Sequence, residues 1–159
     1  MIIRCLKLVL FSVFASFAGG GHAWAGLGED RSMLEKDKKH LGYTHQSQLN
    51  LTASHKPYTV DQLSLGNESV MEYHTLDGVC FAVTWVGSVQ PEISSLLGKY
   101  SDEHAKALTN RPTNKLSRRF GRVESANITV ERFGVANHFS GRAYVPALIP
   151  AGVSLDEIH

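Results

Sequence analysis

Apolar and polar residues alternate through the centre of the chain in a way that predicts β-strands. Runs of this kind cover residues 58–65, 69–76 and 79–86. The dipeptides Gly66-Asn67 and Asp77-Gly78 separate them and are typical of tight hairpin turns. Strands joined by such short turns pair antiparallel. The pattern therefore predicts a three-stranded antiparallel meander in the middle of the chain.

The third run carries no charged residue on either side. Successive side chains of a strand point to opposite faces, so positions 79, 81, 83 and 85 share one face and positions 80, 82, 84 and 86 share the other. A strand without charge on both faces belongs to the middle of a sheet. The even positions begin with the small residues Cys80, Ala82 and Thr84, so we expect a helix to pack closely on that face.

A helical pattern follows directly. Pro91 suits the first position of a helix, and apolar residues then recur at three- and four-residue steps as far as Leu108. Arg111-Pro112 ends the pattern. A second, short helix is predicted from Ser32 to Leu41, since Ser32 and Glu35 have the spacing of a capping box.

Two further strands are predicted at 125–133 and 136–145, joined at Gly134. The polar stretch 43–56 reads as a loop or a marginal edge strand. Two prolines exclude a central strand at 146–150, so the apolar tail either packs as an extended strap or stays exposed. Together these elements predict an α+β fold: a mainly antiparallel sheet of about five strands, one main helix packed on one face, and a short N-terminal helix.

The first 25 residues have the organisation of an export signal. Arg4 and Lys7 precede an uncharged run at 8–18, and Ala23-Trp24-Ala25 places small residues where a signal peptidase cuts. The run is too short to span a bilayer, which takes about 20 apolar residues. We expect residues 1–25 to be removed, residues 26–56 to form an N-terminal helix and polar arm, and residues 57–159 to form the core domain. The protein is then periplasmic or secreted.

Net charge and cysteine content limit the binding partners and the covalent cross-links that can be expected. After removal of the leader, fourteen Lys and Arg face fifteen Asp and Glu, so net charge gives no argument for nucleic-acid binding. Cys5 leaves with the leader, which leaves Cys80 alone and no internal disulfide. The mature chain offers no second long apolar run, and no transmembrane segment is expected in it.

Several segments resemble a bacterial family of small exported proteins, domain-of-unknown-function family 2844. The resemblance rests mainly on Phe81-Ala-Val-Thr-Trp85 and Phe139-Ser-Gly-Arg-Ala-Tyr144, continuing into the Pro-Ala-Leu-Ile-Pro tail at 146–150. It covers nearly all of the mature chain. It implies one compact exported domain and brings no catalytic residue, substrate or cofactor.

Catalytic patterns are weak. Cys80 with His74 or His138 as a base would need an exposed thiol, whereas its apolar neighbours favour an inert core thiol. The seven histidines of the mature chain show no metal-ligand spacing, and no pair of carboxylates stands out. We therefore assign no catalytic, cofactor-binding or metal-binding residue and expect no cofactor. A small hydrolase or metal-dependent enzyme using His74, His138 or Cys80 remains an alternative.

Two stretches are candidate surfaces for an unknown protein or envelope component. The C-terminal part combines aromatic, aliphatic and arginine side chains typical of partner-binding anchors: Phe139, Arg142, Tyr144, Leu148 and Ile149. The segment 106–122 is basic and contains no acidic residue; its candidate anion-binding residues are Arg111, Lys115, Arg118, Arg119 and Arg122. The preferred function is a non-catalytic binding or accessory domain. Binding of an anionic polymer or envelope surface by the basic segment is the second alternative.

Overall fold

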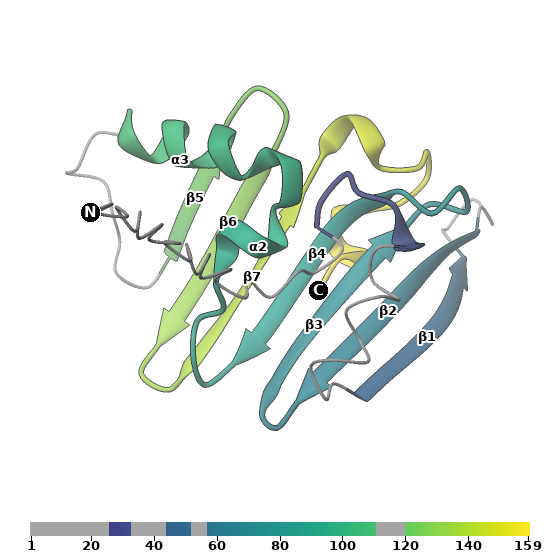
Figure 1. Ribbon diagram of the computed structural model, residues 1–159, viewed down its shortest axis with the longest axis horizontal. Coiled ribbons are helices and arrows are strands. Elements are labelled where there is room, and N and C mark those ends of the chain that lie inside the picture. Colours follow the sequence, from purple (N-terminus) through teal and green to yellow (C-terminus); the bar gives the residue numbers. More distant parts are fainter. Residues whose placement is uncertain (1–25, 33–43, 52–56, 111–119) are drawn as a thin grey trace, which may run out of the picture.

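The protein forms one antiparallel sheet, seen in a computed structural model that describes residues 26–32, 44–51, 57–110 and 120–159. Its strands are arranged in the order β1-β2-β3-β4-β7-β6-β5 (Figure 1). The strands are β1 (Thr44–Leu51), β2 (Pro57–Leu65), β3 (Glu68–His74), β4 (Cys80–Gly87), β5 (Phe120–Glu124), β6 (Thr129–Val135) and β7 (His138–Tyr144). The helical elements are α2 (Ile93–Leu96), η1 (Gly98–Tyr100), α3 (Ser101–Thr109), η3 (Pro146–Leu148) and η4 (Leu155–Glu157).

The sheet consists of two meanders joined by one pair of strands. Strands β1 to β4 follow each other in space as in sequence, and so do β5 to β7. Pairing of β4 with β7 connects the two groups, with Trp85 opposite Gly141 and Ala82 opposite Tyr144. The two segments that carry the family resemblance are thus neighbouring strands at the centre of the sheet.

Gly141 is required by the way Trp85 packs. A Cβ atom at residue 141 would overlap the Trp85 indole and would lie 2.5 Å from the carbonyl oxygen of Glu131. The indole therefore lies against the bare backbone of β7. Trp85 itself is only 3 % exposed and belongs to the main hydrophobic cluster.

A β-bulge at the start of β4 changes which side chains face the helices. The register against β3 shifts between Tyr73 and His74, so that one residue of β4, Phe81, has no pairing partner on β3. Cys80 joins the cluster on the helix side together with Val83 and Trp85, whereas Phe81 and Ala82 pack on the opposite side. The prediction that a helix covers the small-residue face 80, 82, 84 and 86 was wrong, because the helical segment packs on the face of Val83 and Trp85 and the bulge adds only Cys80 to that face.

The predicted fold class was also wrong in its elements. The sheet has seven strands instead of about five. The segment expected as one main helix is broken at Gly98, whose φ of +50° is incompatible with a continuous helix. Its first part places Ile93, Leu96 and Leu97 in the cluster with Val83 and Trp85. Its second part, α3, is fixed to the β5–β6 turn by Glu103, which accepts hydrogen bonds from Ser125 and Asn127.

Both unexpected strands lie at the edges of the sheet. Strand β1 lies in the polar stretch for which the sequence left a loop or an edge strand open, and it is an edge strand. Strand β5 begins at Phe120, inside the segment interpreted as a basic surface connection. Of the predicted N-terminal helix, only Ser32 lies within the described residues.

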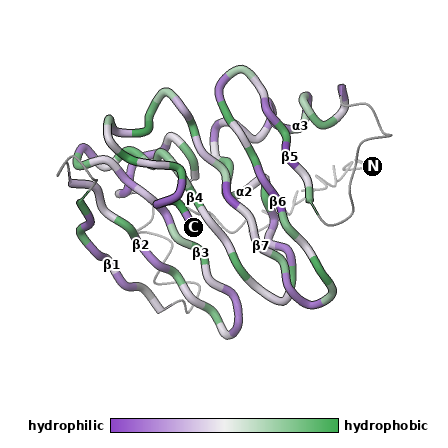
Figure 2. Tube along the Cα trace, turned by 180° about the vertical axis from the view of Figure 1, so that it is seen from behind, coloured by the Kyte–Doolittle hydropathy of each residue, from purple (hydrophilic) through white to green (hydrophobic). Residues whose placement is uncertain are grey.

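The C-terminal tail packs as a strap over the face opposite to α2 and α3 (Figure 2). We call residues 146–159 the strap. Ile158 is fully buried among Tyr58, Tyr73 and Phe81. The Tyr73 hydroxyl donates to the carbonyl oxygen of His159 at 2.9 Å, and Arg142 Nη1 donates to the Leu155 carbonyl oxygen at 2.7 Å. No helix in the described part of the chain has the length and apolar character needed to cross a lipid bilayer.

Substitution of Gly141 tests the central packing. We expect Gly141→Ala to lower the free energy of unfolding by about 1–3 kcal/mol, because the added methyl group overlaps Trp85 in a filled core. Gly121→Ala in β5 is the matched control, since a Cβ there meets nothing closer than 3.7 Å. Urea unfolding of both variants measures the difference. Equal stability of the two variants would contradict the packing described.

Candidate functional site

The strap covers only part of its face of the sheet and leaves a groove beside it. A cavity of about 360 Å³ is lined by Met71 of β3, Val86 of β4, Phe133 of β6, Arg142 of β7 and the strap residues Ile158 and His159. A second cavity of about 500 Å³ adjoins β1 and β2 and shares Met71 and His159 with the first. We call the two together the strap-side groove.

The first part of the groove is bounded by an exposed apolar row that runs across the strands. Val86 is opposite Ser140, Ser140 is opposite Phe133, and Phe133 is opposite Phe120. The rings of Phe133 and Phe120 lie 5.0 Å apart, and the two side chains are 47 % and 43 % exposed. Large apolar side chains gathered in this way are typical of interaction sites rather than of ordinary surface.

The next row of side chains holds charges that neutralise each other. Glu131 is opposite both Arg142 and Arg122, and its carboxylate pairs with Arg142 Nε at 2.6 Å and Arg122 Nη1 at 2.8 Å. Arg122 also contacts Glu124, whose hydrogen bonds raise the pKa of the guanidinium. Because Arg142 also holds two carbonyl groups of the strap, it positions the groove wall.

The second part of the groove is lined by side-chain amides. Gln46 and Gln48 of β1 and Gln62 of β2 line it, with Tyr73 and Glu157 on the strap side. Gln46 is opposite Gln62, which is opposite Met71, so the amides continue the row that leads into the apolar part. Each amide offers both a donor and an acceptor. The groove thus combines an apolar half with a hydrogen-bonding half that is rich in side-chain amides and carries the carboxylate of Glu157 on the strap side.

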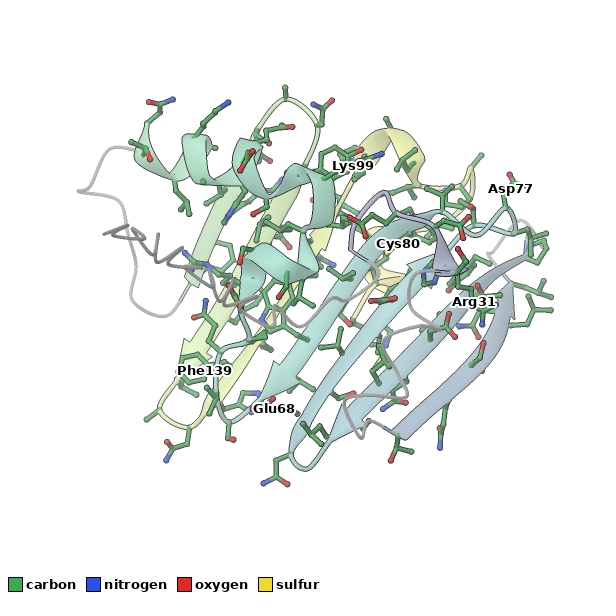
Figure 3. The ribbon with its side chains drawn as sticks, in the orientation of Figure 1. Arg31, Glu68, Asp77, Cys80, Lys99 and Phe139 are labelled. Carbon is green, nitrogen blue, oxygen red and sulfur yellow. The ribbon has the colours of Figure 1, made fainter. Side chains whose placement is uncertain are left out.

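Only one of the predicted partner-surface residues lines this groove, namely Arg142. Phe139 lies at the far end of β7, packed against Gly134 (Figure 3). Tyr144 is buried, and the strap residues Leu148 and Ile149 pack, partly buried, against the core around Phe81.

The groove residues Met71, Val86 and Phe133 were missed as candidates. Val86 had been assigned to the face beneath the helix, and Phe133 to the end of a predicted strand with no surface role. Their signal in the sequence was an apolar residue at a position otherwise open to solvent, which becomes visible only once the faces are known.

Most of the predicted anion-binding residues, Arg111, Lys115, Arg118 and Arg119, lie outside the described residues. Arg122 lies within them, and its charge is matched by Glu124 and Glu131. Within the described part of the chain, the basic segment therefore presents no unmatched arginine next to the groove.

Cys80 has the environment of a core residue. It is fully buried, and burial together with the charge of Glu72 raises the pKa of its thiol well above the ordinary value. A thiol that neither meets solvent nor ionises is not a nucleophile. The interpretation of Cys80 as an inert core thiol agrees with this geometry.

His74 belongs to a buried charged cluster at the Cys80 end of β4. Its Nδ1 lies 3.4 Å from Asp61 Oδ2 and its Nε2 lies 3.6 Å from Glu72 Oε2. Arg31 holds Asp61 through two hydrogen bonds of 2.7 and 2.8 Å. The cluster joins the N-terminal segment to β2 and β3, which is a structural role.

His138 is not a partner for Cys80. It is opposite Val135 at the β6–β7 turn, beyond the end of β4 at which Gly87 is opposite Phe139. Cys80 begins β4, so roughly the length of an eight-residue strand, about 25 Å, separates them. The described residues contain no group of three histidine, cysteine or acidic side chains that could hold a metal ion.

Comparison with known proteins gives a family but no activity. The chain matches the model of the family described as "Protein of unknown function (DUF2844)" over residues 23–158. No curated protein and no solved structure shows a significant match. The match covers most of the chain, including both central strands, the groove and all but the last residue of the strap. The protein therefore belongs to domain-of-unknown-function family 2844.

Proposed function

We propose that this protein is exported from a bacterial cell and acts outside the cytosol as a non-catalytic binding domain. Its ligand is an extended segment of a partner protein, held in the strap-side groove. The observation that carries this proposal is the groove itself. Its apolar part alone, about 360 Å³, falls within the size range of ligand sites, roughly 300–1,000 Å³.

The chemistry of the groove favours a protein segment over a charged polymer. The exposed row of Val86, Phe133 and Phe120 suits apolar side chains, because burying them removes apolar surface from water on both partners. The amides of Gln46, Gln48 and Gln62 can pair with the N–H and C=O groups of an extended backbone. Arg122 and Arg142 beside the groove already pair with Glu124 and Glu131, so these two arginines offer a polyanion no unmatched charge within the described residues.

Two observations support export. The leader pattern ends at Ala25, and the family match begins at residue 23, next to that point. The residues that follow are part of the folded domain, since Leu27 is fully buried. A cut after Ala25 would therefore release a chain that retains the whole described fold.

Export is tested by recovering the full-length gene product from bacterial cells. We expect the protein in the envelope or the medium, with an intact mass that corresponds to Gly26–His159. Cell fractionation followed by mass spectrometry measures both properties. An uncut chain found among the cytosolic proteins would refute this part of the proposal.

Groove occupancy is tested by cross-linking from Val86→Cys in the exported protein. Because Cys80 is buried, the introduced thiol is the reachable one among the described residues and can carry a photoreactive group. We expect a partner to be cross-linked there, and mass spectrometry to locate the link in a segment with apolar side chains. Leu76→Cys is the control, since Leu76 is 63 % exposed in the β3–β4 turn, away from the groove.

A synthetic peptide of the linked segment completes this test. We expect its affinity to fall at least tenfold with Phe133→Asp, equivalent to about 1.4 kcal/mol, because a charge then lies in the apolar row. Leu76→Asp should leave the affinity unchanged. Equal cross-linking from residues 76 and 86, or equal peptide binding by the two Asp variants, would refute the groove as the binding site.

A further inference from the structure

The described fold begins with a tight turn whose backbone is fixed on both sides. Glu29 N–H donates to the Gly26 carbonyl oxygen at 2.9 Å, and Gly28 has a φ of +76°, which favours glycine. Leu27 N–H donates to the carbonyl oxygen of Leu96 at the end of α2. The Gly28 N–H donates to the Cys80 carbonyl oxygen at 2.8 Å, and the Cys80 N–H donates to the backbone carbonyl oxygen of Glu29 at 3.1 Å. The turn therefore joins the helical segment to the central strand.

Two glycines allow a carboxylate to reach the start of this turn. A Cβ on Gly26 would overlap Gly98 Cα, and a Cβ on Gly98 would lie 2.8 Å from Glu29 Oε1. Because neither atom exists, Gly26, Gly98 and the Glu29 carboxylate pack directly together. The backbone nitrogen of Gly26 lies 3.4 Å from Glu29 Oε2 and donates to it.

Cleavage after Ala25 would change the chemistry of this nitrogen. Hydrolysis adds one water across the Ala25–Gly26 amide and breaks its C–N bond. The carboxylate leaves with residues 1–25, and the nitrogen of Gly26 becomes a primary amine that takes up a proton near neutral pH. A neutral amide donor is thereby replaced by an ammonium group at the same place, beside a carboxylate.

We propose that Glu29 is the binding site for the mature N-terminus: removal of the leader creates a Gly26 ammonium that pairs with the Glu29 carboxylate and locks the first turn onto α2 and β4. This inference rests on the exported, processed form proposed above. It adds that processing itself stabilises the fold, because the Glu29 carboxylate then faces a full positive charge instead of a neutral amide, and opposite charges attract.

Two cations near the first turn, Lys99 and Arg31, do not compete with the new ammonium for the Glu29 carboxylate. The side chain of Lys99 lies over Gly28, with Nζ 5.3 Å from the centre of the Tyr100 ring (Figure 3). Arg31 is engaged by Asp61. Within the described residues, neither cation forms an ion pair with Glu29. Cys80, on the other side of the turn, carries a thiol whose raised pKa keeps it neutral.

The ion pair between the Gly26 ammonium and Glu29 makes the stability of the protein depend on pH in a defined direction. An ammonium stabilised by a carboxylate has a pKa above the ordinary α-amino value of about 7.7–8.0. Its contribution to stability is complete below that ordinary value and is lost as the pH rises through the raised pKa. The difference between wild type and a variant without the carboxylate should therefore disappear in alkaline solution.

The experiment uses the full-length gene expressed with its leader, and the processed protein recovered from the envelope. Wild type is compared with Glu29→Gln, Glu29→Asp and the control Asp77→Asn, an exposed carboxylate in the β3–β4 turn. N-terminal acylation by a limiting reagent at pH 8 is followed by mass spectrometry, and thermal unfolding is followed from pH 6 to 11. We expect acylation about tenfold faster in Glu29→Gln than in wild type, partial restoration in Glu29→Asp, and no change in Asp77→Asn.

The outcomes separate this inference from export. A protein that starts at Gly26 but is acylated equally fast in wild type and Glu29→Gln would refute the ammonium site and leave export intact. A loss of stability in Glu29→Gln that persists unchanged to pH 11 would also refute it, because the carboxylate would then act independently of the amine. If Glu29→Gln does not fold, Glu29→Asp supplies the comparison. An uncut chain would refute both proposals, whereas the groove is tested independently by cross-linking.

Discussion

The architecture depends on the pairing of β4 with β7, where the Trp85 indole lies against the bare backbone of Gly141. This pair of strands is the connection between two meanders that are otherwise separate in sequence and in space. The indole occupies the volume that a side chain at residue 141 would need. The same contact places Val83 and Trp85 beneath the helical segment and Thr84 and Val86 on the opposite side, so both faces of the sheet are set by it.

The two faces of the sheet are therefore covered by different elements. On one face, α2 and the first turn of the described chain close a core around Cys80, Val83 and Trp85. On the other face, the strap closes a second core around Phe81. The sheet is wider than the strap, and the surface left over is the groove. Cys80 and His74 are therefore buried, whereas the apolar side chains of Val86 and Phe133 are exposed on the face of the strap.

Local signals in the sequence predicted the hairpins well, because dipeptides such as Gly66-Asn67 specify a turn without help from distant residues. Edge strand β5 was missed because Phe120 stands at the end of a basic run, and its pairing with β6 depends on residues farther along. The bulge at Cys80 and Phe81 was also hidden, since it reflects the register against β3. That shift moved Cys80 to the face of Val83 and Trp85. The helix was predicted on the wrong face of β4 because the small residues of the even face were interpreted as its packing surface. Arg142 was found from its residue type, whereas Val86 was missed because it was placed beneath the helix.

The position of His159 has a practical consequence. Its backbone exchanges hydrogen bonds with the Tyr73 hydroxyl at 2.9 and 3.2 Å, and its side chain lines both halves of the groove. A bulky label attached to this side chain would occupy the space in which the proposed ligand lies. Such a label would compete with the ligand and make an active protein look inert, so labels are better introduced at the exposed β3–β4 turn.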